Sequence, residues 1–397
     1  MSYTYEFNTI VDRSGERSKT WDPRTVKPGQ LPMNGAEMHF ACPIPVLEAV
    51  RAVSRCQVYG YPYFTDDFAK AAAGWMKRRH GWDVDDRWVE FAGGIVPAIA
   101  YTMQAVSRIG EGVIINTPAY APFRDMIRDN ERVLVESPLV IDSGEGSVEF
   151  DWADMERKFA DPNNTVFILC DPQNPTGKCC TLEELKKLEA LSEKYGVFVI
   201  IDEVHADFVF DGGRHICYPA VGEYAKNHSA VTINPSKTFN TAGFRTAAVI
   251  IPNQEIHDKT NVKIAAVKGY SRTITGVAAF EAAYGGACDD FADQACAYIS
   301  AMRDKMCAFF AGNIPEMKII KPQASFVCWC DCRGLGFQEQ DEMMRFFADA
   351  GVLLSNGLEY DRTLGRGFVR IAYGFPEIQL MPALEKLAAA VKARRGK

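Results

Sequence analysis

Residues 165–205 read TVFILCDPQNPTGKCCTLEELKKLEALSEKYGVFVIIDEVH, and this stretch decides the fold class. The run 165–169 is short and apolar, as is typical of a buried strand. Thr181 and Glu184 have the spacing of a capping box, in which each side chain accepts a hydrogen bond from a free backbone amide, so a helix is predicted to begin there. A second apolar run, 197–201, follows. Strand, helix and strand in this order predict parallel strands in an α/β fold.

Polar or aromatic side chains follow the ends of several predicted strands. In open α/β sheets, ligands bind outside the carboxyl ends of the parallel strands. We therefore expect these side chains to converge on one pocket. The side chains are Tyr120 after the run 112–116, Asn174 after 165–169, Asp202 and His205 after 197–201, and Lys237 after 230–233.

The alternation of short apolar runs and amphipathic helices continues from about residue 45 to about residue 285. It predicts a large α/β domain over 45–285 with a mostly parallel central sheet. Residues 286–397 return to helices and short strands, and no flexible linker precedes them. We expect 1–44 and 286–397 to form a smaller α+β domain that packs on the large one.

Composition excludes several classes of protein. The 397 residues include 44 lysines and arginines against 51 aspartates and glutamates, a net charge of −7, and 47% of the residues are hydrophobic. These values are typical of a globular chain, and the acidic balance argues against nucleic-acid binding. No apolar run reaches the roughly 18 residues of a membrane-spanning helix. The first residues lack the segments of a secretory signal, so we expect a cytoplasmic protein.

The 12 cysteines are expected to be reduced thiols, because no export signal is visible. Cys328, Cys330 and Cys332 alternate along a predicted strand and would face one side of it. They lack a fourth cysteine or histidine at ligand spacing, so burial as small apolar side chains is the better interpretation. Cys179 and Cys180 are adjacent and too close together for a useful chelate. No metal site is therefore expected.

Lys237 follows a predicted strand and has apolar neighbours. A lysine whose pKa is lowered by burial or by a nearby cation becomes a nucleophile that forms imines with carbonyl groups. Alone, it would be interpreted as a surface lysine above a strand end. Two features suited to anions accompany it. Arg245 offers a guanidinium fork, and Gly93 and Gly94 precede a predicted helix, whose first amides are free.

Asp202 ends an apolar strand, where an unpaired carboxylate is costly. It requires a positive partner, which is either an ordinary lysine or arginine or a protonated ring nitrogen of a ligand. Tyr120 could stack on a planar ring or could be a core tyrosine. The residues alone leave these alternatives open.

As a set, these motifs resemble the class I/II pyridoxal-phosphate enzymes of fold type I, the fold of aspartate aminotransferase. The resemblance rests on SKTFN at 236–240 with Arg245 beyond it, DPQNPTG at 171–177 and DEVHAD at 202–207. Within that group, the chain resembles the cystathionine β-lyase branch of C–S lyases, of the MalY/PatB type. The closer likeness also includes YGY at 59–61, RHGW at 79–82, GIVPAIA at 94–100 and TPAYAPF at 117–123.

The resemblance implies that Lys237 binds pyridoxal 5'-phosphate covalently and that Asp202 pairs with its ring nitrogen. Asn174 and His205 would lie near the ring hydroxyl, and Tyr120 over the ring face. A homodimer with shared active sites is also implied, and Arg370 would bind the substrate α-carboxylate. The phosphate group would contact the backbone amides of Ile95 and Val96, the side chains of Ser236 and Arg245, and Tyr61 of a second subunit.

Two positions depart from the lyase pattern. The lyase branch usually reads ADMDF where this chain reads AEMHF at 36–40, so His39 stands at the expected substrate mouth and is a candidate substrate contact. Arg245 is more typical of the aminotransferases.

The sequence therefore predicts a pyridoxal-phosphate-dependent C–S β-lyase that converts L-cystathionine or a related cysteine S-conjugate to pyruvate, ammonia and a thiol. An aminotransferase is the alternative within the same fold. A ligand-sensing module on an enzyme fold is the alternative from another class, although a module has little need of Lys237, Asp202 and Asn174 together.

Overall fold

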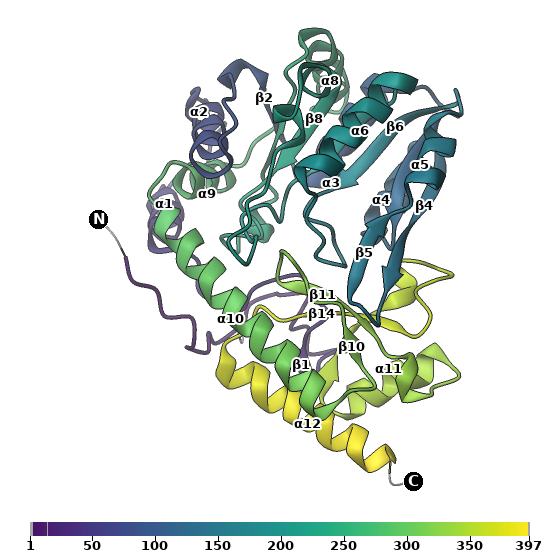
Figure 1. The fold of residues 1–397 in the computed structure, drawn as a ribbon. Helices are drawn as coiled ribbons and strands as arrows, with labels where there is room; N and C mark the ends of the chain where they lie inside the picture. Colours follow the sequence, from purple (N-terminus) through teal and green to yellow (C-terminus); the bar gives the residue numbers. More distant parts are fainter. Residues whose placement is uncertain (1–2, 14, 396–397) are drawn as a thin grey trace.

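A central sheet of eight strands forms the upper part of the molecule in Figure 1. The computed structural model describes residues 3–13 and 15–395. Across the sheet the strand order is β2-β9-β8-β7-β6-β3-β4-β5. The strands are β2 (Val89–Ala92), β3 (Gly112–Thr117), β4 (Val133–Asp142), β5 (Ser147–Phe150), β6 (Asn164–Cys170), β7 (Phe198–Asp202), β8 (Ser229–Ile233) and β9 (Ala247–Ile250).

The middle of this sheet is parallel, as predicted. Strands β8, β7, β6, β3 and β4 run in one direction, whereas β9 is antiparallel to β8, β2 to β9 and β5 to β4. Cys170 pairs with Asp202, and Asp202 pairs with Thr232. The carboxyl ends of β6, β7 and β8 therefore lie level at one edge of the sheet, where ligands bind in open α/β folds.

Helices cover both faces of the sheet. On one face, Ile99 of α3 belongs to the same apolar cluster as Val113 and Ile115 of β3. On the other face, Leu188 of α6 clusters with Ile114. This alternation follows from the two-residue period of a strand. The helices are α1 (Ile44–Ser54), α2 (Asp67–Trp75), α3 (Ile95–Val106), α4 (Ala121–Asp129), α5 (Trp152–Phe159), α6 (Leu182–Tyr195), α7 (Glu223–Asn227), α8 (Gln254–Ala266), α9 (Ile274–Tyr284), α10 (Asp289–Asn313), α11 (Gln340–Asp349) and α12 (Glu377–Arg395).

The predicted capping box is present at the start of α6. The Thr181 hydroxyl accepts a hydrogen bond from the Glu184 backbone amide at 3.2 Å, and the Glu184 carboxylate accepts one from the Thr181 amide at 2.8 Å. The helix ends at Gly196, whose φ of 72° lies in the left-handed region that a glycine adopts without strain. Strand β6, helix α6 and strand β7 thus form as the local sequence predicts.

A second, smaller sheet lies below the first in Figure 1, flanked by the long helices α10 and α12. Its order is β10-β11-β14-β13, and every neighbouring pair is antiparallel. Nearby, β1 (Leu31–Pro32) pairs in parallel with β12 (Val352–Leu353), so the N-terminal segment joins the C-terminal part of the chain. The strands of the smaller sheet are β10 (Lys318–Ile319), β11 (Val327–Asp331), β13 (Ser355–Asn356) and β14 (Phe368–Ala372).

The predicted fold class, a mostly parallel sheet with a smaller α+β unit, is confirmed. The 12 cysteines are free thiols. Cys328 and Cys330 lie on β11, whereas Cys332 directly follows that strand rather than forming part of it. The sulfur atoms of Cys330 and Cys332 lie 3.8 Å apart, and all three cysteines are buried. Within the described residues, no helix combines the length and the apolar composition needed to cross a membrane.

Candidate active site

A cavity of about 740 Å³ lies at the carboxyl ends of the parallel strands. The loop after β6 contributes Asn174, β7 ends in Asp202, and Lys237 follows β8. Strand β14 of the smaller sheet adds Arg370. Most of the residues predicted for the site therefore meet in one place. Those that line the cavity are Ile95, Val96, Tyr120, Asn174, Asp202, His205, Ser236, Lys237, Arg245 and Arg370.

The Lys237 amine lies inside the protein, where its Nζ atom donates a hydrogen bond to the backbone oxygen of Ala36 at 2.5 Å. Burial and the positive charge of Arg370 lower the pKa of Lys237 to about 8. A lysine with such a pKa is partly neutral near neutral pH, so it can act as a nucleophile or a base. The structure thus excludes the interpretation of Lys237 as a surface lysine.

Asp202 is a buried carboxylate with few partners. One of its oxygens accepts a hydrogen bond from the backbone amide of Val204 at 3.1 Å. Within the described part of the chain, no lysine or arginine forms an ion pair with it. Burial raises the pKa of Asp202 to about 7. Such a group is well suited to bind a protonated ring nitrogen, which would supply the missing positive charge.

His205 and Tyr120 add an imidazole and a phenol ring to the cavity wall. The Nδ1 atom of His205 lies 2.9 Å from the Ser325 hydroxyl, whereas the buried Nε2 atom has no hydrogen-bond partner among the described residues. Burial and the charge of Lys237 lower the pKa of His205 far below its usual value, so the imidazole is neutral. The Tyr120 ring packs edge-on against Phe123 and also faces the cavity.

Arg370 is held in place by several acceptors. Its Nη1 atom donates to the side-chain oxygen of Asn174 at 3.2 Å, and its Nη2 atom donates to the backbone oxygen of Asn34 at 2.5 Å and to the Ser355 hydroxyl at 3.2 Å. Within residues 3–13 and 15–395, the buried Nε atom has no hydrogen-bond partner. A guanidinium fixed in this way and open to a cavity is suited to bind a carboxylate.

Another group of cavity residues is suited to an anion. Ile95 and Val96 are the first residues of α3, and the amides of a helix's first turn have no partner within the helix. Gly94, which precedes the helix, has a φ of 134°. A Cβ atom at Gly94 would lie 3.9 Å from Nε of Arg245, so this guanidinium is close to the start of the helix. Ser236 contributes a hydroxyl to the same cavity.

The structure places two of the predicted residues away from the cavity wall. Tyr61 is fully exposed, at 107%. His39 is buried; its Nδ1 atom accepts a hydrogen bond from Trp21 Nε1 at 3.1 Å, and its ring stacks on Phe375 at 3.8 Å. His39 is therefore part of the packing behind the cavity, and the geometry does not support direct contact with a substrate.

Sequence analysis missed several residues of the site. Lys19, Glu37 and Glu359 line the cavity, and Ser325 holds His205 from outside it. Lys19, Glu359 and Ser325 come from segments without a recognisable motif, and only tertiary packing brings them to the site. Glu37 had a signal, because it lies two residues before His39 in the stretch that departs from the lyase pattern.

Comparison with known proteins agrees with this geometry. The family model "Aminotransferase class I and II" matches residues 32–387. The chain is 32% identical to "Cystathionine beta-lyase PatB" of Bacillus subtilis, over 97% of this chain and 99% of the relative. It is 30% identical to "Protein MalY" of Escherichia coli, over 98% of this chain and 100% of the relative.

A solved structure is also similar over the full length. The structure of cystalysin from Treponema denticola, described as containing a pyridoxal 5'-phosphate cofactor, has a TM-score of 0.93 and 29% identity, and the match covers 98% of this chain and 100% of that one. The strand-end cavity, the family model and these relatives lead to one conclusion. The chain belongs to the class I and II aminotransferase family.

Proposed function

We propose that this protein is a pyridoxal-phosphate-dependent C–S β-lyase that cleaves L-cystathionine or a related cysteine S-conjugate to pyruvate, ammonia and a thiol. The observation that carries the proposal is the meeting of Lys237 and Asp202 in one cavity, together with Arg370. The names of PatB, a cystathionine β-lyase, and of cystalysin, which holds pyridoxal phosphate, support the same cofactor and the same class of reaction.

The unpaired groups of the cavity fit this cofactor. Asp202 has no cationic partner among the described residues and would bind the protonated ring nitrogen. The free Nε2 atom of His205 and the amide of Asn174 would bind the ring hydroxyl, and Tyr120 would cover the ring face. Lys237 would bond to the cofactor aldehyde. The phosphate would be held by the amides of Ile95 and Val96, the Ser236 hydroxyl and the Arg245 guanidinium.

Each residue would then have a defined task in the reaction. Arg370 binds the α-carboxylate of the amino acid and so orients its Cα–H bond. The Lys237 amine, once the amino group of the substrate has replaced it at the aldehyde, would take the α-proton, and the Cβ–S bond would break with its electron pair leaving on sulfur. Pyridoxal phosphate, when bound, supplies an electron sink for the developing carbanion. The three-carbon enamine that is released hydrolyses to pyruvate and ammonia.

Incubation of the holoenzyme with L-cystathionine in the absence of any keto acid tests the proposal. Release of both a thiol and pyruvate supports elimination. Turnover that requires an added keto acid would identify an aminotransferase instead. A protein that takes up no pyridoxal phosphate would favour a ligand-binding module. Lys237→Ala is the control, because this variant keeps the cavity but lacks the amine.

We further propose a cytoplasmic homodimer in which Tyr61 of one subunit contacts the cofactor phosphate of the other. The exposed aromatic side chains around Tyr61 support a contact with a second copy. Val58, Tyr59 and Tyr63 are exposed at 82%, 63% and 90%. Apolar side chains that cluster on a surface mark interaction sites.

A further inference from the structure

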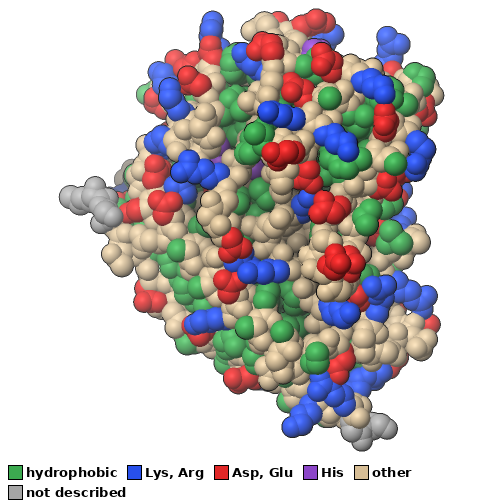
Figure 2. All heavy atoms as spheres, viewed as in Figure 1, with side chains coloured by type: hydrophobic (Ala, Val, Ile, Leu, Met, Phe, Trp, Pro, Cys, Tyr) green, Lys and Arg blue, Asp and Glu red, His purple; other side chains and the backbone are tan. Residues whose placement is uncertain are grey.

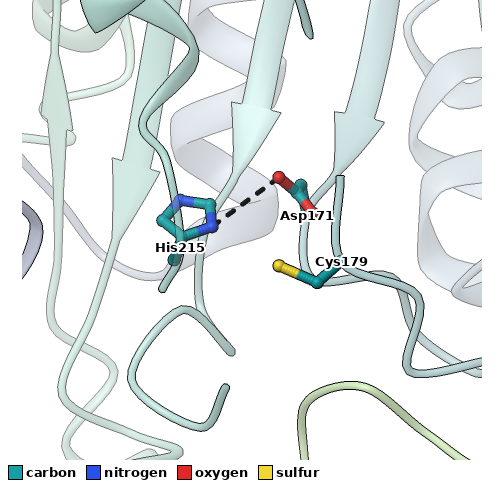
Figure 3. Close-up of side chains that lie close together, drawn as sticks. All are labelled: Asp171, Cys179 and His215. Carbon is teal, nitrogen blue, oxygen red and sulfur yellow. Dashed lines mark ion pairs between the residues drawn. The ribbon is translucent and has the colours of Figure 1, made fainter. Parts of the chain in front are cut away.

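A cluster of buried side chains lies outside the catalytic cavity and has no task in the proposed reaction. It contains Asp171, Cys179 and His215, which point toward one another in Figure 3. Asp171 directly follows β6, Cys179 lies in the loop before α6, and His215 lies in the loop after β7. The three residues are 1%, 9% and 4% exposed.

The distance between His215 and Asp171 is too long for a hydrogen bond. Nδ1 of His215 lies 3.6 Å from Oδ2 of Asp171, and this buried nitrogen has no hydrogen-bond partner among the described residues. The ligand atoms of Asp171, Cys179 and His215 all lie within 4.8 Å of one another. Two ligands bound tetrahedrally to a metal at about 2.1 Å are roughly 3.4 Å apart, so the separation of His215 and Asp171 suits two ligands of one ion.

Each of the three residues is also oriented by a contact on its outer side. Nε2 of His215 lies 3.1 Å from a carboxylate oxygen of Glu203. The other oxygen of Asp171, Oδ1, accepts a hydrogen bond from the backbone amide of Cys180 at 2.9 Å. The backbone amide of Cys179 donates to Gln323 Oε1 at 3.0 Å. A histidine that binds a metal through one ring nitrogen usually places the other against a carboxylate in this way.

We propose that Asp171, Cys179 and His215 form a binding site for a divalent transition-metal ion of the zinc class, with Glu203 as the outer partner of the histidine. One nitrogen, one sulfur and one oxygen donor are a set that Zn²⁺ accepts, whereas Mg²⁺ and Ca²⁺ require oxygen donors. Three protein ligands leave the fourth position of a tetrahedral ion for another donor.

An entry path is present beside the cluster. His215 also lines a surface hollow of about 510 Å³, together with His80 and Asp207. An ion could therefore reach the imidazole without crossing the catalytic cavity. Cysteine spacing does not reveal this site, because Asp171 and His215 are not cysteines and His215 comes from a separate loop.

The test uses the holoenzyme without a histidine tag, in a background in which the exposed Cys56 is replaced by serine. The protein is dialysed against Zn²⁺, and bound zinc is measured by atomic emission and by competition with a chromophoric chelator. We expect about one ion per chain, loss of affinity by more than tenfold in Cys179→Ser, and a loss on the order of 10- to 100-fold in Glu203→Gln.

Cys307→Ser is the matched control, because Cys307 lies on α10, outside the cluster. It should bind zinc as the Cys56→Ser parent does. Equal zinc binding by the Cys179→Ser variant, or no zinc binding by the parent, would overturn the proposal. Should Cys179→Ser fail to fold, Co²⁺ added to the parent decides, because a thiolate-to-cobalt absorption band supports the site and its absence refutes it. Lyase activity is not needed for any of these readouts.

Discussion

Asp202 combines full burial with the absence of a cationic partner among the described residues, and this has a consequence for stability. Because its pKa is raised to about 7, the folded protein binds a proton that the unfolded chain releases near pH 4. The cofactor-free protein therefore loses stability as pH rises toward 7, where the carboxylate must ionise without a partner. A protein that holds the cofactor regains this free energy, since the ring nitrogen provides the partner.

Asp202→Asn should consequently stabilise the cofactor-free protein. The advantage of the variant should grow by about 2–3 kcal/mol between pH 5 and pH 8, because the wild-type carboxylate ionises over this range and the amide does not. Urea unfolding of both proteins at the two pH values measures this difference in the free energy of unfolding. A difference in stability that does not change with pH would contradict the argument.

Arg370 offers a second test at the level of one residue. Its planar fork is fixed by Asn174, Asn34 and Ser355, and a lysine in its place would present one point charge without that geometry. Arg370→Lys should raise KM for the amino-acid substrate by about tenfold or more and change kcat less. Steady-state kinetics measures both constants, and unchanged absorbance of the bound cofactor serves as the control. An unaltered KM would remove Arg370 from substrate binding.

At the level of single elements, the start of α3 depends on one backbone conformation. Gly94 has a φ of 134°, which an L side chain adopts only with strain. Gly94→Ala should therefore shift the first turn of α3 and weaken cofactor binding, at a cost on the order of 1–3 kcal/mol. Fluorescence titration of the cofactor-free variant with pyridoxal phosphate measures the change. Gly81→Ala is the comparison, because Gly81 has a φ of 71° but lies outside the cavity, and it should leave cofactor affinity unchanged.

The elements also show how far the sequence predicts the structure. β6, α6 and β7 were predictable because an apolar run and a capping box are local signals. The antiparallel direction of β2 and β9 was not, since it depends on pairing between residues far apart in the chain. The same difference between local and long-range signals applies to the site. Asn174, Asp202 and Lys237 lie within a few residues of the ends of predicted strands, whereas Ser325 and Glu359 come from loops that only tertiary packing brings near.

At the level of the whole molecule, the exposed Tyr61 and the buried Lys237 should serve different subunits. If active sites are shared, Tyr61→Ala and Lys237→Ala each impair both sites of their own dimers. Unfolding and refolding the two variants together then creates mixed dimers that contain one intact site. A random mixture should recover about a quarter of wild-type lyase activity.

As the control, each variant is unfolded and refolded alone, which should recover no lyase activity. Recovery that is no greater in the mixture than in these controls would show that Tyr61 acts within its own subunit or not at all. Size-exclusion chromatography with light scattering establishes the number of chains independently of activity.

The N-terminal segment contacts two functional groups of the cavity. Residues 31–32 pair with β12, and the backbone oxygens of Asn34 and Ala36, which follow, accept hydrogen bonds from Arg370 and Lys237. The contacts that orient the guanidinium of Arg370 and hold the amine of Lys237 therefore come from one short segment, 34–36. A change in the length or position of this segment would disturb both functional groups together.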